Sequence, residues 1–281
     1  MVAWGMTRAL ILPLLVAAAV GCDDTSNGVG DGGAGGDQSV ALDGGGPPPP
    51  DLFGQPPPDM TCINQQFLGF LGASAGERRV SCACGCTIDP FSNASQVNQI
   101  WNGTIMSTTF APSTSGLSVT PDSPDGGTAI GALTSLNPAG PFFLDGDFDL
   151  LVDYELTGTL PPSAEALLQV NNPKPPIDST YTIERQTTGA GVNEYRASLA
   201  GIQPVEQASA KTSGTLELTR EGFTVRAVAD GSEISRYTGD KGNRLAILLT
   251  AGVTGCAGGS CRFTVKWRNL RLVSGMLVDR N

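Results

Sequence analysis

The strongest constraint on the fold is a strict alternation of apolar and polar side chains over residues 147–156. Every second residue from Phe148 to Leu156 is apolar, and the residues between them are mostly Asp or Glu. A side-chain period of two is typical of a β-strand with one face against a core and the other face in solvent. We therefore expect residues 147–156 to form a long, half-buried strand.

Shorter runs of the same kind recur along the chain, separated by Gly, Pro, Asn and Asp roughly every eight to twelve residues. The further predicted strands cover 166–170, 180–185, 215–220, 223–228, 232–237, 245–251 and 262–272. Glu221-Gly222 separates two of them and predicts a two-residue hairpin turn. Only 93–100 is expected to be helical, with Ser92 or Asn93 as its cap. The chain is therefore predicted to be all-β, an antiparallel sandwich of two sheets.

Residues 1–21 have the features of a secretory signal peptide. Arg8 supplies positive charge, and the apolar stretch from Ala9 to Val20 is shorter than the roughly 20 residues of a spanning helix. The stretch ends in Ala19-Val20-Gly21-Cys22, which resembles the lipobox of bacterial lipoproteins. The resemblance implies that Cys22 is lipidated and anchors the chain to a membrane. We expect an extracytoplasmic lipoprotein of the cell envelope.

Residues 22–60 are rich in Gly, Pro and Asp and contain few apolar side chains. Seven Asp residues lie here, with no Lys or Arg. Such a stretch buries too little apolar surface to offset the entropy lost on ordering, so we expect a disordered spacer. Its length suits display at the outer membrane or cell surface, which we favour. Asp23, directly after Cys22, is associated in enteric bacteria with the inner membrane, which is the alternative.

The rest of the chain divides into a Cys-rich segment, 61–87, and a sandwich domain, 88–281. Residues 61–281 contain 20 acidic and 16 basic residues, so this part is only mildly acidic at −4. Most of the net charge of −10 at pH 7 therefore lies before residue 61. Because there is no basic stripe, nucleic acid is not an expected partner.

Three segments together resemble the concanavalin A-like lectin and glucanase family, which includes laminin-G-like modules. They are Gly146-Asp-Phe-Asp-Leu-Leu-Val-Asp-Tyr154, Thr212-Ser-Gly-Thr-Leu-Glu-Leu-Thr-Arg-Glu-Gly-Phe-Thr-Val225 and Phe263-Thr-Val-Lys-Trp-Arg-Asn-Leu-Arg-Leu-Val-Ser-Gly275. The likeness covers residues 88–275 and consists of hydrophobic and turn patterns. It implies a jelly roll of two curved antiparallel sheets, of which the concave one often binds glycans. Some members of the family also hold calcium.

Histidine is absent from the sequence. Its absence excludes Ser-His-Asp and Cys-His catalysis and the common His-based zinc sites. The resemblance implies that catalytic relatives carry a strand beginning Glu-x-Asp, but none of the nine glutamates has an Asp two residues later. We therefore expect that the protein is not an enzyme. A divergent glycoside hydrolase with an unfamiliar pair such as Asp149 and Asp153 ranks last among three functional hypotheses.

Asp145, Asp147 and Asp149 recur at a spacing of two, which places them on one face of the predicted strand. Calcium prefers several oxygen ligands, so these three residues are candidates for a Ca²⁺ site, the one cofactor we consider. The alternative is a solvated outer face, with Arg185, Arg196 or Arg226 on a neighbouring strand as the cationic partner. We rank this alternative above the metal site.

Sugar binding usually needs an aromatic platform. Trp267 is in phase with the apolar side chains of its predicted strand, so we expect it in the core. The candidate ligand-binding residues are Trp101, Tyr181, Tyr237 and Asp149.

An even number of cysteines follows Cys22, which outside the cytoplasm predicts three disulfides. They are Cys62, Cys82, Cys84, Cys86, Cys256 and Cys261. One scheme pairs Cys256 with Cys261, Cys62 with Cys84 and Cys82 with Cys86. The other ties some of Cys82, Cys84 and Cys86 to Cys256 and Cys261.

These features favour a membrane-anchored, non-catalytic binding protein whose partner is a glycan or another surface ligand on the concave sheet. The alternative is a structural module that contacts other envelope proteins. Both hypotheses rest on the compartment and on the resemblance, and a fold alone does not fix a function.

Overall fold

The computed structural model describes residues 78–82, 85–158, 160–174, 179–255, 259 and 261–279. The predicted signal peptide, the spacer and Cys22 lie outside these residues, as do Cys62, Cys84 and Cys256. Among the described helices, none has both the length and the apolar character needed to cross a membrane.

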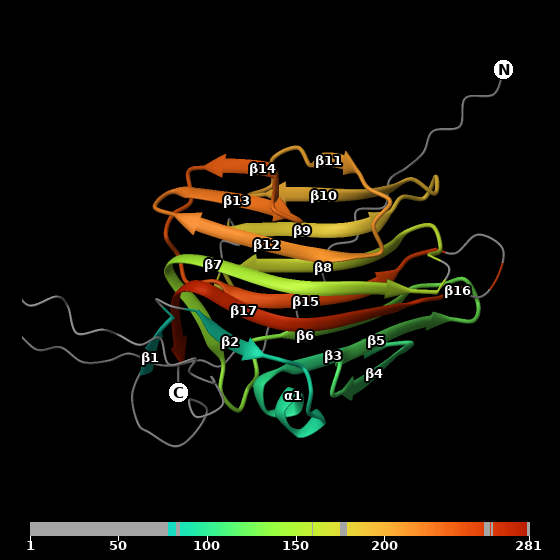
Figure 1. Ribbon diagram of the computed structural model, residues 1–281, viewed down its shortest axis with the longest axis horizontal. Coiled ribbons are helices and arrows are strands. Elements are labelled where there is room, and N and C mark those ends of the chain that lie inside the picture. The colour runs from blue at the N-terminus through green and yellow to red at the C-terminus, as the bar shows by residue number, and fades with distance from the viewer. Residues whose placement is uncertain are drawn as a thin grey trace, which may run out of the picture. The chain divides into compact units, whose positions relative to one another are not determined.

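The described chain forms two antiparallel β-sheets that stack face to face (Figure 1). Sheet A follows the order β14 (Ser232–Thr238), β13 (Thr224–Ala229), β12 (Ser213–Glu221), β7 (Phe142–Thr157), β17 (Thr264–Asp279), β5 (Gly116–Ser123) and β16 (Cys261–Arg262). Also in this sheet, β1 (Arg78–Ser81) and β2 (Cys86–Asp89) pair with β17, and β4 (Thr108–Ser113) pairs with β5. Sheet B follows the order β11 (Val205–Ala208), β10 (Asn193–Leu199), β9 (Thr180–Thr187), β8 (Ala164–Asn171), β15 (Ala246–Val253), β6 (Ala129–Thr134) and β3 (Asn102–Met106). The prediction of an all-β, two-sheet antiparallel sandwich is confirmed.

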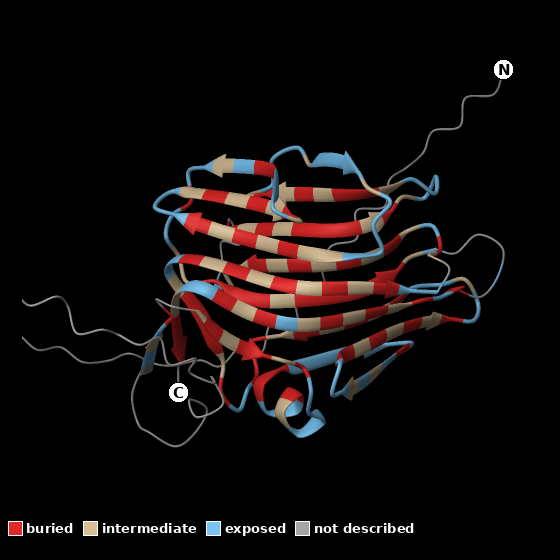
Figure 2. Cartoon of the chain, in the orientation of Figure 1, coloured by how far each residue is buried: buried red, intermediate tan, exposed pale blue. Residues whose placement is uncertain are grey.

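One hydrophobic core fills the space between the two sheets. Figure 2 shows buried and partly exposed residues alternating along most strands, as expected when each strand turns one face to the core. In β7 the buried set includes Phe148, Leu150 and Val152, in the phase that the sequence predicts. Trp267 is 1% exposed and lies in the core, as expected.

The structure shifts one predicted turn by a residue. Glu221 pairs with Thr224, so the two-residue turn between β12 and β13 is Gly222-Phe223 rather than Glu221-Gly222. The reason is the backbone of Gly222, whose φ of +58° suits the first position of a tight hairpin turn. The predicted helix is present as α1 (Ala94–Ile100), capped by the Asn93 side chain, which accepts a hydrogen bond from the Ser95 amide.

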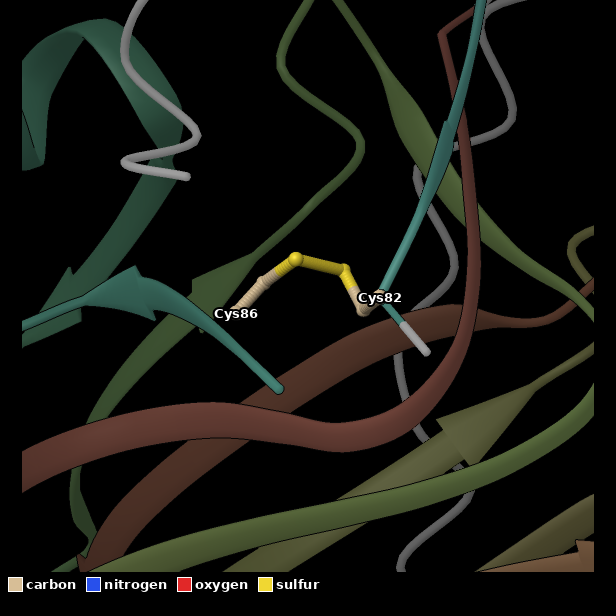
Figure 3. Close-up of a disulfide and its surroundings, with 2 residues drawn as sticks. All are labelled: Cys82 and Cys86. Carbon is tan, nitrogen blue, oxygen red and sulfur yellow. A yellow bond between two sulfur atoms is a disulfide. The ribbon is translucent and has the colours of Figure 1, made fainter. Parts of the chain in front are cut away.

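A disulfide joins Cys82 to Cys86 at the start of β2 (Figure 3). This pair belongs to the first of the two predicted schemes. Cys261 is disulfide-bonded as well. The Cys82 amide donates a 2.8 Å hydrogen bond to the Gly275 carbonyl, so the small disulfide loop is attached to β17.

Candidate functional site

The outer face of sheet B, which points away from the core, carries an unusual group of charged side chains at its centre. In β9 the side chains of Tyr181 and Ile183 belong to the core, so Glu184 and Gln186 lie on the opposite face. The antiparallel register places them beside residues of β8 and β10. We call this group the outer-face cluster; it consists of Glu165, Glu184, Gln186, Glu194 and Arg196.

Two cross-strand contacts hold the outer-face cluster together. Arg196 Nη1 lies 3.4 Å from Glu184 Oε1, and Gln186 Nε2 donates a 2.7 Å hydrogen bond to Glu194 Oε1. Arg196 Nε also lies 3.7 Å from Glu206 Oε1 on the edge strand β11. Glu184 and Glu194 are only 7% and 6% exposed, although both point away from the core. The strands β8, β9 and β10 therefore bury carboxylates on a face that faces solvent.

Two carboxyl groups of this cluster, those of Glu184 and Glu165, have raised pKa values. Burial raises the pKa of Glu184 to about 7, and the negative charge of Glu165 adds to the rise, while Arg196 opposes it. Burial also raises the pKa of Glu165. A carboxyl group that is partly protonated near neutral pH can donate a proton or a hydrogen bond, and such groups are common at functional sites.

The other half of the same face is apolar. Leu167 on β8 lies opposite Thr250 on β15, and Leu248 lies two residues along β15 on the same face. On β6, Ile130 lies opposite Gly252, and Met106 of the edge strand β3 lies opposite Ile130. We call this group the apolar half; it consists of Leu167, Leu248, Ala132, Ile130 and Met106. Charged and apolar surfaces thus adjoin on sheet B.

The predicted acidic strand lies on the outer face of sheet A. Asp145 forms ion pairs with Arg79 and Arg244 at 3.8 and 3.4 Å. Asp147 accepts a 2.8 Å hydrogen bond from the Gly222 amide. The three predicted calcium ligands therefore have separate partners, since Asp149 bonds to Glu217 instead.

Further along this strand the cationic partners come from β17, and none of the arginines predicted as partners pairs with it. Asp153 accepts a 2.7 Å hydrogen bond from Asn269 Nδ2 and lies 3.5 Å from Arg271 Nη1, and Glu155 pairs with Arg268. The prediction of Arg185, Arg196 or Arg226 is wrong because β7 lies between β12 and β17. Arg185 and Arg196 belong to sheet B, and Arg226 of β13 pairs with Glu221.

Asp149 and Glu217 form a carboxyl pair at the centre of this sheet A face. They share a hydrogen bond, and burial raises the pKa of both groups, with Arg271 opposing the rise. In the described part of the chain, no group of three or more Cys, Asp or Glu side chains is placed to hold a metal ion. Calcium binding by Asp145, Asp147 and Asp149 stays a prediction.

Trp101 and Tyr181 occupy interior positions, and Tyr237 is half-buried. Trp101 is 3% exposed, and its Nε1 donates a 2.8 Å hydrogen bond to Asp89. Tyr181 is 1% exposed and donates a hydrogen bond to Asp240, while the ring of Tyr237 lies 6.2 Å from that of Tyr181. Of the four predicted ligand-binding residues, Asp149 alone lies on the outer face of a sheet.

Sequence reasoning missed the outer-face cluster. A signal is present, because Glu184 and Arg196 have opposite charges and both lie in alternating segments that become adjacent strands. The pairing of β9 with β10 could not be deduced from sequence, however, because an alternating segment shows which of its faces is apolar and not which strand lies beside it. Opposite charges on two strands mark a site only when their register is known.

No model of a known protein family matches the sequence, and no curated protein matches it either. Solved structures do match at low identity. The catalytic domain of an endo-1,3-β-glucanase (laminarinase) from Thermotoga petrophila is 10% identical, with a TM-score of 0.48 over 73% of this chain and 99% of that one. A β-glucanase from Bacillus licheniformis is 10% identical, with a TM-score of 0.44 over 71% and 99%. The carbohydrate-binding module CBM66 from Bacillus subtilis is 12% identical, with a TM-score of 0.36 over 60% and 94%.

These matches contradict the prediction that the chain is not an enzyme, because two of them are glucanases. The physical reason is that glycoside hydrolysis needs two carboxyl groups and no histidine. A Glu-x-Asp strand is one way to supply them. Glu165 and Glu184 lie on the neighbouring strands β8 and β9, and a search along a single strand does not consider such a pair.

Proposed function

We propose that this protein binds a glycan on the outer face of sheet B. The proposal rests on one observation, the outer-face cluster beside the apolar half. Sugars present hydroxyl groups at their edges and C–H groups on their ring faces. Carboxylate, amide and guanidinium groups can donate and accept hydrogen bonds with the hydroxyls, and Leu167, Leu248 and Ile130 offer an aliphatic surface for the rings.

A glycan array with the full-length protein tests this proposal, followed by titration calorimetry with any oligosaccharide that binds. Glu184→Gln and Arg196→Met are each expected to weaken binding about tenfold or more, because hydrogen bonds to charged groups contribute about 1.5–3 kcal/mol. Glu217→Gln is the matched control. Glu217 is also a partly buried carboxyl group near an arginine, Arg271, but both residues belong to sheet A. A blank array, or binding that depends on Glu217 and not on Glu184, would overturn the proposal.

Glycoside hydrolysis or transfer at the same face is the second candidate, and the raised pKa of Glu184 favours it. A general acid must be protonated at the working pH, and burial holds the pKa of Glu184 at about 7. Glu165 would be the second carboxyl. In this case the rate should fall as pH rises through about 7, because Glu184 loses its proton.

The measurement is release of reducing ends from the oligosaccharides that bind. Glu184→Gln should lower the rate by at least about a hundredfold, because a positioned proton donor contributes about 10²–10⁴. Binding without any release by the parent protein would exclude this second candidate and leave glycan binding intact.

The lipid anchor and the location are also proposals. We infer from the lipobox-like Ala19-Val20-Gly21-Cys22 that Cys22 is lipidated and that the sandwich is displayed at the outer membrane or cell surface. Cys22→Ala should move the protein from the membrane fraction to the soluble fraction. Proteinase added to whole cells should remove the sandwich if it is surface-displayed and spare it otherwise.

A further inference from the structure

Strand β3 is an open edge of sheet B (Figure 1). It is the last strand in the order of that sheet and pairs with β6, and no strand of the described chain pairs with its other side. All five of its residues are exposed, with Ile105 at 57% and Met106 at 55%. An exposed edge presents backbone N–H and C=O groups that can pair with another strand.

The two apolar side chains of β3 lie on opposite faces of this edge. Met106 pairs with Ile130, so its side chain lies on the outer face of sheet B with the apolar half. Ile105 pairs with Gly131, where an added Cβ would lie 2.6 Å from the Thr108 side chain of β4, so Ile105 points to the inner face. A strand placed beside β3 would therefore be contacted by an apolar side chain on each of its faces.

The part of the sandwich around β3 carries no charge. Residues 90–121 contain no Asp, Glu, Lys or Arg, although 16% of the whole chain is charged, and residues 126–144 have none either. These two stretches supply α1, β3, β4, β6 and most of β5, which are neighbours in the structure. Depletion of charge is typical of the buried centre of a protein–protein interface.

The other edge strands of the described sheets are protected against pairing. Each carries a charged residue or a proline, which are devices that keep a sheet edge from joining another chain. They include Glu206 in β11, Glu233 and Arg236 in β14, and Pro112 in β4. Strand β3 has neither, and its pairing with β6 has no bulge. Strand β3 is thus the edge that is left open to a partner strand.

We propose that β3 pairs antiparallel with β3 of a second copy of this chain, about a twofold axis perpendicular to sheet B. The chain has a net charge of −10, so two copies avoid repulsion at close range only where their surfaces are neutral. A second copy presents the same neutral edge, whereas a charged partner would find no opposite charge here. With Thr104 on the axis, Gly103 lies opposite Ile105 and leaves space for it, and the two Thr104 side chains form a cross-strand pair.

This pairing joins the two seven-stranded copies of sheet B into one continuous sheet. Because the axis is perpendicular to the sheet, both outer faces point to the same side, and the two apolar halves adjoin across the axis. Ile105 and Met106 become covered by the partner strand. The inference goes beyond the proposed function and does not depend on it.

Sedimentation equilibrium tests the dimer. The sample is the Cys22→Ala variant, which keeps the rest of the chain and cannot be lipidated at that residue. The mass should rise towards that of two chains across about 1–100 µM, the range expected for a small, reversible interface. Hydrogen exchange of the β3 amides should slow over the same range, because dimerisation gives them partners.

Two variants in this background test the register. Thr104→Lys and Thr104→Glu each place two like charges at the axis and should weaken the dimer at least about tenfold. An equimolar mixture of the two variants should associate again as a heterodimer, because opposite charges then face each other across the axis. Gln207→Lys on the exposed edge strand β11 is the matched control and should leave the dimer unchanged. Thermal unfolding of each variant checks that the fold is kept.

Each contrary result has its own meaning. A mass of one chain at every concentration overturns the dimer, and slow exchange of the β3 amides in that monomer would show that another segment of the same chain covers the edge. A dimer that survives both Thr104 variants uses a different surface and overturns the assignment to β3. Two weakened variants whose mixture stays monomeric overturn the twofold register. Failure of glycan binding would overturn the proposed function and leave the dimer unaffected.

Discussion

Asp89 illustrates how a single buried residue fixes the role of an aromatic one. Asp89 is fully buried, and its carboxylate accepts hydrogen bonds from the Phe91 amide at 2.6 Å and from Trp101 Nε1 at 2.8 Å. Burial nevertheless raises the pKa of Asp89 to about 6, because two hydrogen bonds do not replace full hydration. The indole N–H of Trp101 is therefore occupied inside the protein, which explains why this tryptophan is not a surface platform.

Trp101→Phe should lower the free energy of unfolding by about 1–3 kcal/mol. The change keeps an aromatic ring in the core but removes the N–H that satisfies Asp89, leaving a buried carboxylate oxygen without a partner. Chemical denaturation monitored by circular dichroism is the measurement. Tyr237→Phe is the control, because the Tyr237 hydroxyl donates a long 3.3 Å hydrogen bond at an exposed position. A loss for Trp101→Phe no larger than that of the control would contradict this role.

Glu184 gives the protein a pH-dependent stability whose sign follows from the direction of its pKa shift. In the unfolded chain Glu184 loses its proton near pH 4.5, whereas in the folded protein its pKa is about 7. The stability that comes from this group is fully present below pH 4.5 and is lost as pH rises towards 7, by about 3.4 kcal/mol at 1.36 kcal/mol per pH unit. Asp89 contributes a further loss of stability as pH rises between 3.8 and about 6.

Urea unfolding at pH 5 and pH 8 measures this effect. Glu184→Gln should lessen the difference in unfolding free energy between the two pH values, because glutamine does not titrate. Glu206→Gln, on an exposed neighbouring strand, should leave the difference as it is. An undiminished difference in Glu184→Gln would show that Glu184 ionises normally in the folded protein.

At the scale of the strands, the close approach of two neighbouring backbones requires glycine at particular positions. Gly275 in β17 has a φ of +132°, and a Cβ there would lie 2.9 Å from the Asp147 carbonyl oxygen and 3.0 Å from Phe148 Cα on β7. The two long central strands pair with bulges in this region, and only glycine allows their backbones to approach so closely.

Gly275→Ala should therefore lower the midpoint of thermal unfolding far more than a turn substitution does. We expect a loss of about 3 kcal/mol or more, from left-handed strain plus a backbone clash. Gly231→Ala is the matched control, since Gly231 also has a positive φ, +75°, but a Cβ there would have no atom within 4 Å. Its loss should be about 1 kcal/mol. If both variants lose the same unfolding free energy, the left-handed backbone conformation alone, and not the close approach of β7, explains the need for glycine at position 275.

The strands themselves show how much of the fold the sequence could reveal. Strands with a clear period of two were predicted well: β8 and β12 lie within two residues of their predicted ends, and β7 begins five residues before its predicted start. Strand β3 was missed because all five of its residues are exposed, which leaves no apolar periodicity to detect. Strand β10 was missed although its sequence alternates between polar and apolar residues from Glu194 to Leu199.

The candidate site was harder to predict than the fold for a physical reason. The acidic face of β7 is a property of one strand, so its sequence shows it directly. The outer-face cluster depends on which residues of three strands lie side by side, and register is set by the packing of the whole sheet. The burial of Glu184 depends on the same packing.

Across the whole molecule, buried polar groups tie the two sheets together. Arg220 of β12 in sheet A pairs with Asp240 at 3.2 Å, and Asp240 also accepts a hydrogen bond from Tyr181 of β9 in sheet B. Both charged side chains are at most 1% exposed. A second link joins Tyr154 of sheet A to Tyr195 of sheet B at 2.7 Å, and Tyr195 then donates to Asp230. The sheets are therefore held in one relative position by directional bonds as well as by the core.

Asp240→Ala should be among the most destabilising single changes in the described chain. Removing the carboxylate leaves the buried Arg220 without its ion-pair partner, which typically costs 3–5 kcal/mol of unfolding free energy. The double variant Arg220→Met and Asp240→Ala should recover part of that loss, because it also removes the unpaired charge, and the recovery measures the coupling between the two residues.

Arg236→Met serves as the control, since its ion pair with Glu233 is exposed and should contribute less than about 1 kcal/mol. If the double variant is no more stable than Asp240→Ala, the burial of an unpaired guanidinium is not the cause, and the hydrogen bond from Tyr181 is the dominant tie between the sheets.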